Sequence, residues 1–144
     1  MLDAIQIRGE VLTALLEEAR QEPMKECCGL LAGRHGVTTR AFPAANAADD
    51  ATGAYEIAPE ELFRLIHEIR AAGLELLGIY HSHPTGENQP SARDIERAYY
   101  PTAGYFIVSP RSDVLQPVRA FSIREGKVTE LGIRAVERHE RDGG

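Results

Sequence analysis

An apolar segment that ends in two histidines places the strongest constraint on how this sequence can fold. Residues 75–83 read ELLGIYHSH, a run that predicts a buried β-strand. Side chains alternate between the two faces of a strand, so His81 and His83 point to the same side near its carboxyl end. Such strand ends are where open α/β sheets commonly bind ligands. The sequence therefore predicts a pair of imidazoles at one edge of a sheet.

A metal site would need a third ligand beside this pair. Two neutral imidazoles can bind zinc through nitrogen, but two ligands do not complete a zinc site. Asp94 lies eleven positions beyond His83, and the loop between them contains proline and glycine, so it could fold Asp94 back toward the strand end. His81, His83 and Asp94 would leave a fourth position for water, which is the mark of a catalytic zinc site.

The same residues also have purely structural interpretations. The segment SARD at 91–94 matches a capping box, in which Ser91 caps a helix and Asp94 completes the cap. HSH alone is more often a polar pair at a strand end than a pair of ligands. The combination of the two motifs at this spacing favours the metal site, and a cap at Ser91 does not exclude it.

Hydrolysis by an activated water also requires a base that takes the proton of the water and passes it to the leaving amine. The chain has 22 acidic residues, so many carboxylates are candidates. Glu26 is distinguished by its position directly before the apolar segment CCGLLAG, which places it at the edge of a neighbouring strand.

The pattern of apolar residues predicts one mixed α/β domain over residues 1–136 and a flexible tail over 137–144. We expect a curved mixed sheet with the first two helices on its faces and the third beside the metal. The expected helices cover 9–22, 59–72 and 91–99. The expected strands cover 5–7, 27–34, 37–42, 55–57, 75–83, 104–109 and a terminal hairpin at 118–136 that turns at 125–127.

Charge and cysteine content narrow the functional class. The net charge of −6 argues against DNA or RNA as a partner, because nucleic-acid affinity depends on clustered Lys and Arg. No apolar run approaches the roughly 18 residues that cross a bilayer, and the N-terminus lacks a signal-peptide core. Cys27 and Cys28 are adjacent, so a disulfide between them would be strained. We expect a cytoplasmic protein that does not insert into membranes.

These motifs resemble those of the JAMM (MPN+) zinc metalloproteases. The pattern of that family is an upstream glutamate, then H-[ST]-H, seven residues and S-x-x-D. It reads here as Glu26, HSH at 81–83, PTGENQP at 84–90 and SARD at 91–94. The segment ECCGLLAG also resembles the family's ExCG(I/L)L segment, and the resemblance extends over roughly residues 1–135.

The resemblance implies a fold similar to that of cytidine deaminases and a role for each site residue. His81, His83 and Asp94 would bind one Zn²⁺ per chain. Glu26 would act first as general base and then as general acid. Ser91 would help to stabilise the oxyanion that forms on the attacked carbonyl.

The remaining cysteines and histidines are expected to have no part in the chemistry. Cys28 matches the family's strand cysteine and is expected to be a small buried packing residue, with Cys27 packed or half-exposed. His67 is expected on a helix surface, His35 in a hairpin turn and His139 in the tail.

JAMM enzymes cut peptide or isopeptide bonds that follow the C-terminal diglycine of ubiquitin-like proteins. Deubiquitinating members carry long insertions, but only about ten residues separate Asp94 from the strand at 104–109. The chain is more similar to short bacterial and archaeal members, some of which act on sulfur carriers. We therefore expect a zinc peptidase or isopeptidase acting after the diglycine of a ubiquitin-like or sulfur-carrier protein. Many relatives form homodimers, and the sequence leaves open whether this chain does.

Two other classes remain as alternatives. The first is a non-catalytic MPN scaffold or recognition module, although such domains usually lose a ligand or the glutamate, and all are present here. The second is another zinc hydrolase such as a deaminase, whose H-x-E and P-C-x-x-C signature is missing. The terminal Gly143 and Gly144 suggest a conjugable tail, but the rest of the sequence does not resemble a ubiquitin-like fold.

Overall fold

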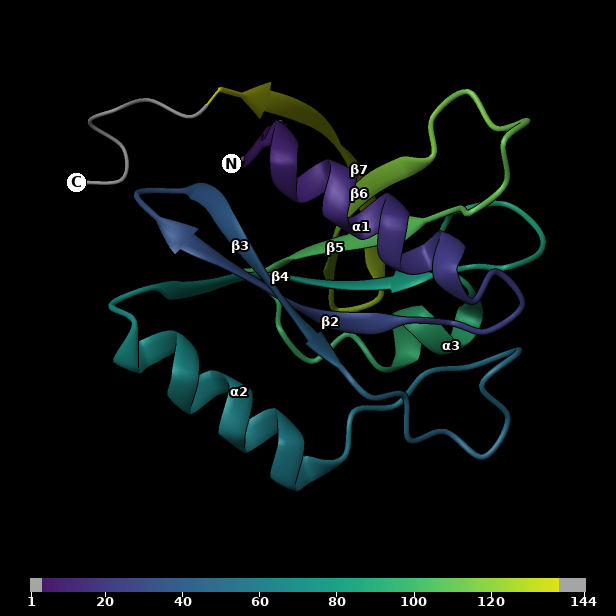
Figure 1. Cartoon of the computed structure of the whole chain (residues 1–144), viewed down its shortest axis with the longest axis horizontal. Helices are drawn as coiled ribbons and strands as arrows, with labels where there is room; N and C mark the ends of the chain where they lie inside the picture. Colours follow the sequence, from purple (N-terminus) through teal and green to yellow (C-terminus); the bar gives the residue numbers. More distant parts are fainter. Residues whose placement is uncertain (1–3, 138–144) are drawn as a thin grey trace.

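The computed structural model describes residues 4–137, in which seven strands form one sheet that closes on itself (Figure 1). Around the sheet the strands follow the order β1-β3-β2-β4-β5-β6-β7. The strands are β1 (Ala4–Arg8), β2 (Cys28–Arg34), β3 (Val37–Ala44), β4 (Glu75–Ser82), β5 (Gly104–Val108), β6 (Val118–Arg124) and β7 (Lys127–Val136). The helices are α1 (Gly9–Gln21), α2 (Pro59–Ala71) and α3 (Ala92–Glu96). None of these helices has the length and apolar composition needed to cross a bilayer.

The sheet is mixed, as the sequence predicts. β1 runs parallel to β3 and to β7, β4 runs parallel to β5, and the other neighbours are antiparallel. We expected a curved sheet, and the structure adds that the curvature closes. The closing seam is short, because β1 and β3 share only two residue pairs, Gln6 with Val37 and Ile7 with Thr38.

Two apolar clusters cover opposite faces of the central strands. Val11, Leu15 and Ala19 of α1 belong to the first cluster, together with side chains of β1, β4 and β5. Leu65 and Ile69 of α2 belong to the second, with the alternate side chains of β4 and β5. Because both of their faces are covered, β2, β4 and β5 read as nearly continuous apolar runs. The carboxyl end of β4 is therefore held in a densely packed part of the molecule.

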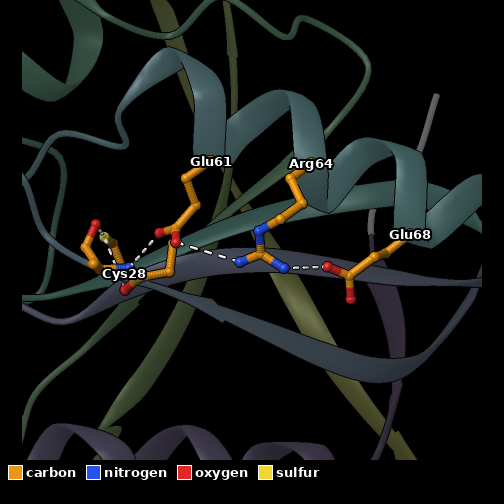
Figure 2. Close-up of polar contacts among 6 residues, drawn as sticks. Cys28, Glu61, Arg64 and Glu68 are labelled. Carbon is orange, nitrogen blue, oxygen red and sulfur yellow. Dashed lines mark hydrogen bonds and ion pairs between the residues drawn. The ribbon is translucent and has the colours of Figure 1, made fainter.

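Polar contacts tie α2 to the end of β3, close to the start of β2 (Figure 2). The carboxylate of Glu61 accepts a hydrogen bond from the backbone N–H of Ala45 at 2.6 Å. Arg64 lies between Glu61, at 3.3 Å, and Glu68 on the same helix. The thiol of Cys28 lies beside this contact. The first turn of α2 thereby fixes the point at which β3 passes into the loop at 45–58.

The prediction of a strand at 55–57 is wrong, because this segment pairs with no neighbouring strand. The backbone groups of Glu56 are paired within the loop instead. Its N–H donates to Oδ1 of Asn46 at 3.1 Å, and its carbonyl accepts from Ala47 N–H at 2.7 Å. These bonds satisfy the backbone locally, so no partner strand is required.

The helix expected to reach residue 99 ends at Glu96, which is also a correction. Tyr100 precedes Pro101, and a residue before proline is disfavoured in the helical region. The Tyr100 N–H donates instead to the hydroxyl of Tyr105 at 2.9 Å. The other expected elements are present, with ends that differ by a residue or two.

Two of the remaining histidines lie where the sequence placed them. His67 is exposed on α2, and His35 is exposed in the turn between β2 and β3 with a positive φ of 54°. His139 and the tail from residue 138 onward lie outside the described residues.

A hydrogen bond between α1 and β4 crosses the first cluster. The hydroxyl of Tyr80, which is fully buried, donates to Oε1 of Glu18 at 2.6 Å. The Tyr80 ring occupies the space beside Gly29, where an added Cβ would lie only 2.5 Å from the Tyr80 hydroxyl oxygen. Burial raises the pKa of Glu18, and the bond from Tyr80 opposes part of that rise.

We expect Glu18→Gln to keep the Tyr80 hydrogen bond while removing a pH dependence of stability. Because folding raises the pKa of Glu18, the folded state binds more protons than the unfolded state once the pH exceeds about 4.3. The contribution of Glu18 to the free energy of unfolding is therefore greatest in acid and is lost as the pH rises through the raised pKa. Urea denaturation across this interval should show the wild type losing stability relative to the variant.

The exposed Glu17 on the same helix provides the control, because Glu17→Gln should follow the wild type at every pH. A constant difference in stability between wild type and Glu18→Gln from about pH 4 to pH 8 would contradict the assigned burial.

Candidate metal centre

The two histidines are positioned by the ladder on both sides of β4. His81 lies between Cys28 of β2 and Ile107 of β5. The N–H of His83 donates to the carbonyl of Val108 at 2.8 Å, which continues the pairing with β5 one residue beyond the end of β4. The backbone of His83 thus stays extended, and both imidazoles share one face. Their Nε2 atoms lie 3.0 Å apart.

Asp94 is brought to the histidines by the N-terminal cap of α3. The capping box is present, because Ser91 Oγ accepts from the Asp94 N–H at 3.1 Å and Asp94 Oδ2 accepts from the Ser91 N–H at 2.9 Å. The same Oδ2 lies 3.2 Å from Nε2 of His81 and 3.1 Å from Nε2 of His83. The structural and the metal-site interpretations of SARD therefore involve one carboxylate.

One ligand atom from each of the three residues lies within 4.8 Å of the others, which is compatible with a metal site. Burial lowers the pKa of His81 and so favours the neutral imidazole that metals bind. At His83 burial acts in the same direction, but the hydrogen bonds to Asp94 and to the Glu87 carbonyl outweigh it and raise the pKa. Burial likewise opposes ionisation of Asp94, yet hydrogen bonds from both histidines hold its pKa well below its usual range. The cluster therefore contains an ionised carboxylate beside two imidazole nitrogens, a set of groups suited to a cation.

The orientation of His83 supports this fit. Its Nδ1 lies 2.9 Å from the carbonyl oxygen of Glu87, which can only accept a hydrogen bond. Nδ1 therefore donates its proton to that carbonyl, and Nε2 is the ring nitrogen that faces Asp94 and His81 and would bind a metal. A second partner that fixes the tautomer in this way is common for histidines that bind metals.

Glu26 lies two residues before the start of β2, next to this cluster. It is buried, with 8% of its surface exposed, and it lines a cavity of about 240 Å³ together with His83, Asp94 and Ser91. Burial raises the pKa of Glu26 to about 7; the charge of His83 opposes this rise and that of Asp94 adds to it. The structure therefore brings Glu26 and the proposed ligands to one site.

Two residues that contact this site were not assigned a role from the sequence. Tyr55 stacks on the ring of His81, with centroids 4.4 Å apart and planes at 19°. The amide of Asn46 donates to the carbonyls of Glu26 and Ala54, each at 2.9 Å. The sequence offered two signals for these roles, a lone tyrosine and an asparagine in a loop of small polar residues. Asparagine often closes turns through its side chain.

Neither cysteine is suited to be a nucleophile or a ligand. Cys28 is fully buried and Cys27 half-buried, and both are free thiols. Burial raises the pKa of Cys27 to about 11 and that of Cys28 to about 12, so both stay protonated at neutral pH. The packing role predicted for Cys28 is confirmed.

Comparison with known proteins gives consistent results. Residues 9–124 match the family described as prokaryotic homologs of the JAB domain. The chain is 40% identical over 109 residues to the desampylase of Haloferax volcanii, covering 74% of this chain and 78% of that protein. It is 33% identical over 135 residues to the CysO-cysteine peptidase of Mycobacterium tuberculosis, covering 92% of each. It is 39% identical to a probable TtuB-protein conjugate cleaving protease of Thermus thermophilus, covering 81% and 77%.

Solved structures show the same fold. A protein from Desulfitobacterium hafniense superposes with a TM-score of 0.80 at 29% identity, covering 95% of this chain and 96% of that one. A structure described as a JAMM metalloprotease-like zinc site superposes with a TM-score of 0.57 at 19% identity, covering 90% and 97%. At that lower identity the likeness concerns the fold alone.

We expect Asn46→Ala to loosen the loop at 45–58 and the backbone of Glu26. The Asn46 side chain also accepts from the N–H groups of Ala48 and Glu56, so its removal leaves several backbone groups without partners. The free energy of unfolding of the variant should be lower than that of the wild type by about 1–3 kcal/mol. Hydrogen exchange should be faster at the amides of Ala48 and Glu56.

Asn88→Ala is a matched control, because the amide of Asn88 donates to the carbonyl of Gln116 and is remote from Glu26 in the chain. It should leave exchange in the loop at 45–58 unchanged. Equal exchange at Ala48 in the wild type and Asn46→Ala would contradict the role given to Asn46.

Proposed function

The chain belongs to the family of prokaryotic JAB-domain homologues and is a hydrolase, and on this basis we propose that it is a zinc-dependent peptidase or isopeptidase. It would hydrolyse the bond that follows the C-terminal diglycine of a ubiquitin-like or sulfur-carrier protein. The observation that carries the proposal is the convergence of His81, His83 and Asp94 within 4.8 Å, beside the cavity that Glu26 lines.

The three converging atoms suit zinc, which binds two imidazole nitrogens and one carboxylate oxygen in several hydrolytic sites. Within residues 4–137 this is the one group of three or more potential ligands that converges, so we propose one ion per chain. When bound there, zinc would act as a Lewis acid. It would lower the pKa of water enough for a hydroxide nucleophile to be available near neutral pH.

Glu26 is the proposed proton carrier. A carboxyl whose pKa lies near 7 can accept a proton from water and donate it again at neutral pH, which is what a base that becomes an acid must do. Its buried position keeps bulk water from competing for that proton. The backbone around Glu26 is fixed on both sides, because its N–H donates to the Ala51 carbonyl at 2.7 Å and its carbonyl accepts from Asn46.

Ser91 is the proposed stabiliser of the oxyanion. Its oxygen accepts the cap hydrogen bond from Asp94, so its hydroxyl proton remains available for a second partner. Ser91 lines the cavity with Glu26, which supports a role for that proton as a donor to a carbonyl oxygen that becomes negative.

The substrate class is inferred from two observations. The relatives are named for desampylation, for a CysO-cysteine peptide and for TtuB conjugates. The cavity is small, about 240 Å³, and a diglycine has no side chains that would hinder entry into a narrow space. A folded carrier with an extended diglycine tail fits both.

We expect Glu26→Gln to retain bound zinc and the fold but to lose activity by at least about 100-fold, because it removes the proton carrier and no ligand. His83→Ala and Asp94→Ala should lose zinc as well. The measurement is intact mass of a sulfur-carrier protein extended beyond its diglycine, with zinc content by elemental analysis.

His67→Ala is the matched control, since this exposed histidine on α2 should affect neither zinc nor turnover. Normal turnover by Glu26→Gln would contradict the assigned base. Full zinc content without any cleavage by the wild type would favour a scaffold or recognition module instead.

A further inference from the structure

Arg93 is a cationic residue that lines the cavity, and none of the proposed catalytic roles involves it. It lies on α3 directly before Asp94 and lines the cavity with Glu26 and His83. Arg97, one turn further along and also lining the cavity, is paired with Glu56 at 3.8 Å. The guanidinium of Arg93 has no such acidic partner among residues 4–137.

The charge of Arg93 acts on the part of the cavity where Glu26 lies. Burial raises the pKa of Glu26 most, and the positive charges of His83 and Arg93 are the two influences that lower it. Arg93 and Glu26 line the same cavity and form no ion pair with each other, so both side chains remain available to a substrate bound there.

Hydrolysis places the leaving group near Glu26. The amide C–N bond breaks, the oxygen of water bonds to the carbonyl carbon, and a proton from water passes through Glu26 to the leaving nitrogen. The residue that carries this nitrogen must therefore occupy the part of the cavity that Glu26 lines.

The chemistry of the leaving group differs between the two classes of bond. In a single C-terminal amino acid, the α-carboxylate carbon lies about 2.5 Å from the leaving nitrogen, two bonds away. It would enter the same cavity, among the carboxylates of Glu26 and Asp94, which repel it. In an isopeptide the leaving nitrogen is that of a lysine side chain, which carries only methylenes at this distance.

We propose that Arg93 binds the free α-carboxylate of a single amino acid that follows the diglycine. The enzyme then prefers carriers extended by one α-linked residue and releases that residue as a free amino acid. This proposal rests on the proposed function and narrows its substrate class. The planar guanidinium can hold both carboxylate oxygens at once, a geometry that the point charge of lysine does not offer.

The test compares two substrates that differ only in this charge. A sulfur-carrier protein is prepared with Gly-Gly-Ala at its end, once with a free carboxylate and once as the carboxamide. Wild-type enzyme should cleave the carboxylate form with kcat/KM higher by roughly 10- to 100-fold, the effect of one hydrogen bond to a charged group. Arg93→Gln should reduce that ratio to less than about threefold, and Arg93→Lys should restore part of it.

Arg124→Gln is the control for the loss of one positive charge, because Arg124 lies at the turn between β6 and β7 and is exposed. It should keep the full preference for the carboxylate. Equal cleavage of both substrates by the wild type would overturn the proposal, as would a similar loss on both substrates in Arg93→Gln, which would mean a contact with the carrier itself.

A binding measurement separates this proposal from the proposed function. Calorimetric titration of Glu26→Gln enzyme with each substrate should show tighter binding of the carboxylate form, and the additional change Arg93→Gln should abolish the difference. A preference in binding without any turnover by the wild type would contradict the hydrolysis but support Arg93. Turnover without a preference in either assay would keep the hydrolysis and overturn the role of Arg93.

Discussion

One carboxylate oxygen, Oδ2 of Asp94, joins the local structure of the chain to its candidate site. It accepts a hydrogen bond from the backbone N–H of Ser91, the N-cap residue of α3. It also faces Nε2 of both His81 and His83. A helix of five residues is too short to be stable through its own hydrogen bonds. The placement of α3 therefore depends on this oxygen, and the cavity depends on α3, because Ser91 and Arg93 reach it from there.

The rest of the fold keeps the other half of the cluster rigid. β4 is covered by α1 on one face and by α2 on the other, so the backbone that carries His81 is held by packing as well as by the ladder. The loop at 45–58 is held differently. Its conformation depends on the amide of Asn46 and on the contact of Glu61 with Ala45, and these polar contacts also set the position of Tyr55 and Glu26.

The parts of this structure that the sequence predicts are those with a local physical signature. Helical spacing of apolar residues located α1 and α2, and strand alternation together with HSH located β4 and its two imidazoles. The capping motif located the start of α3. These features depend on interactions between residues near one another in the chain.

The parts that sequence analysis missed depend on specific partners rather than on a repeating pattern of apolar residues. Closure of the sheet requires β1 to meet β3, and only two residue pairs form there. The end of α3 reflects a hydrogen bond to Tyr105, and the loop around Glu56 is paired with Asn46 rather than with a strand. The role of Tyr55 follows from stacking on His81 across the fold. No periodicity within a segment reports such contacts.

The position of β1 has a consequence for synthesis of the protein. β1 makes five residue pairs with β7, the last strand among residues 4–137, and only two with β3. A nascent chain that has not yet released residues 127–136 from the ribosome can build the antiparallel pairs of β2 with β3 and β4, but its first strand lacks most of its partners. Closure of the sheet therefore waits until residues 127–136 have left the ribosome, and until then β1 presents an open edge to other chains.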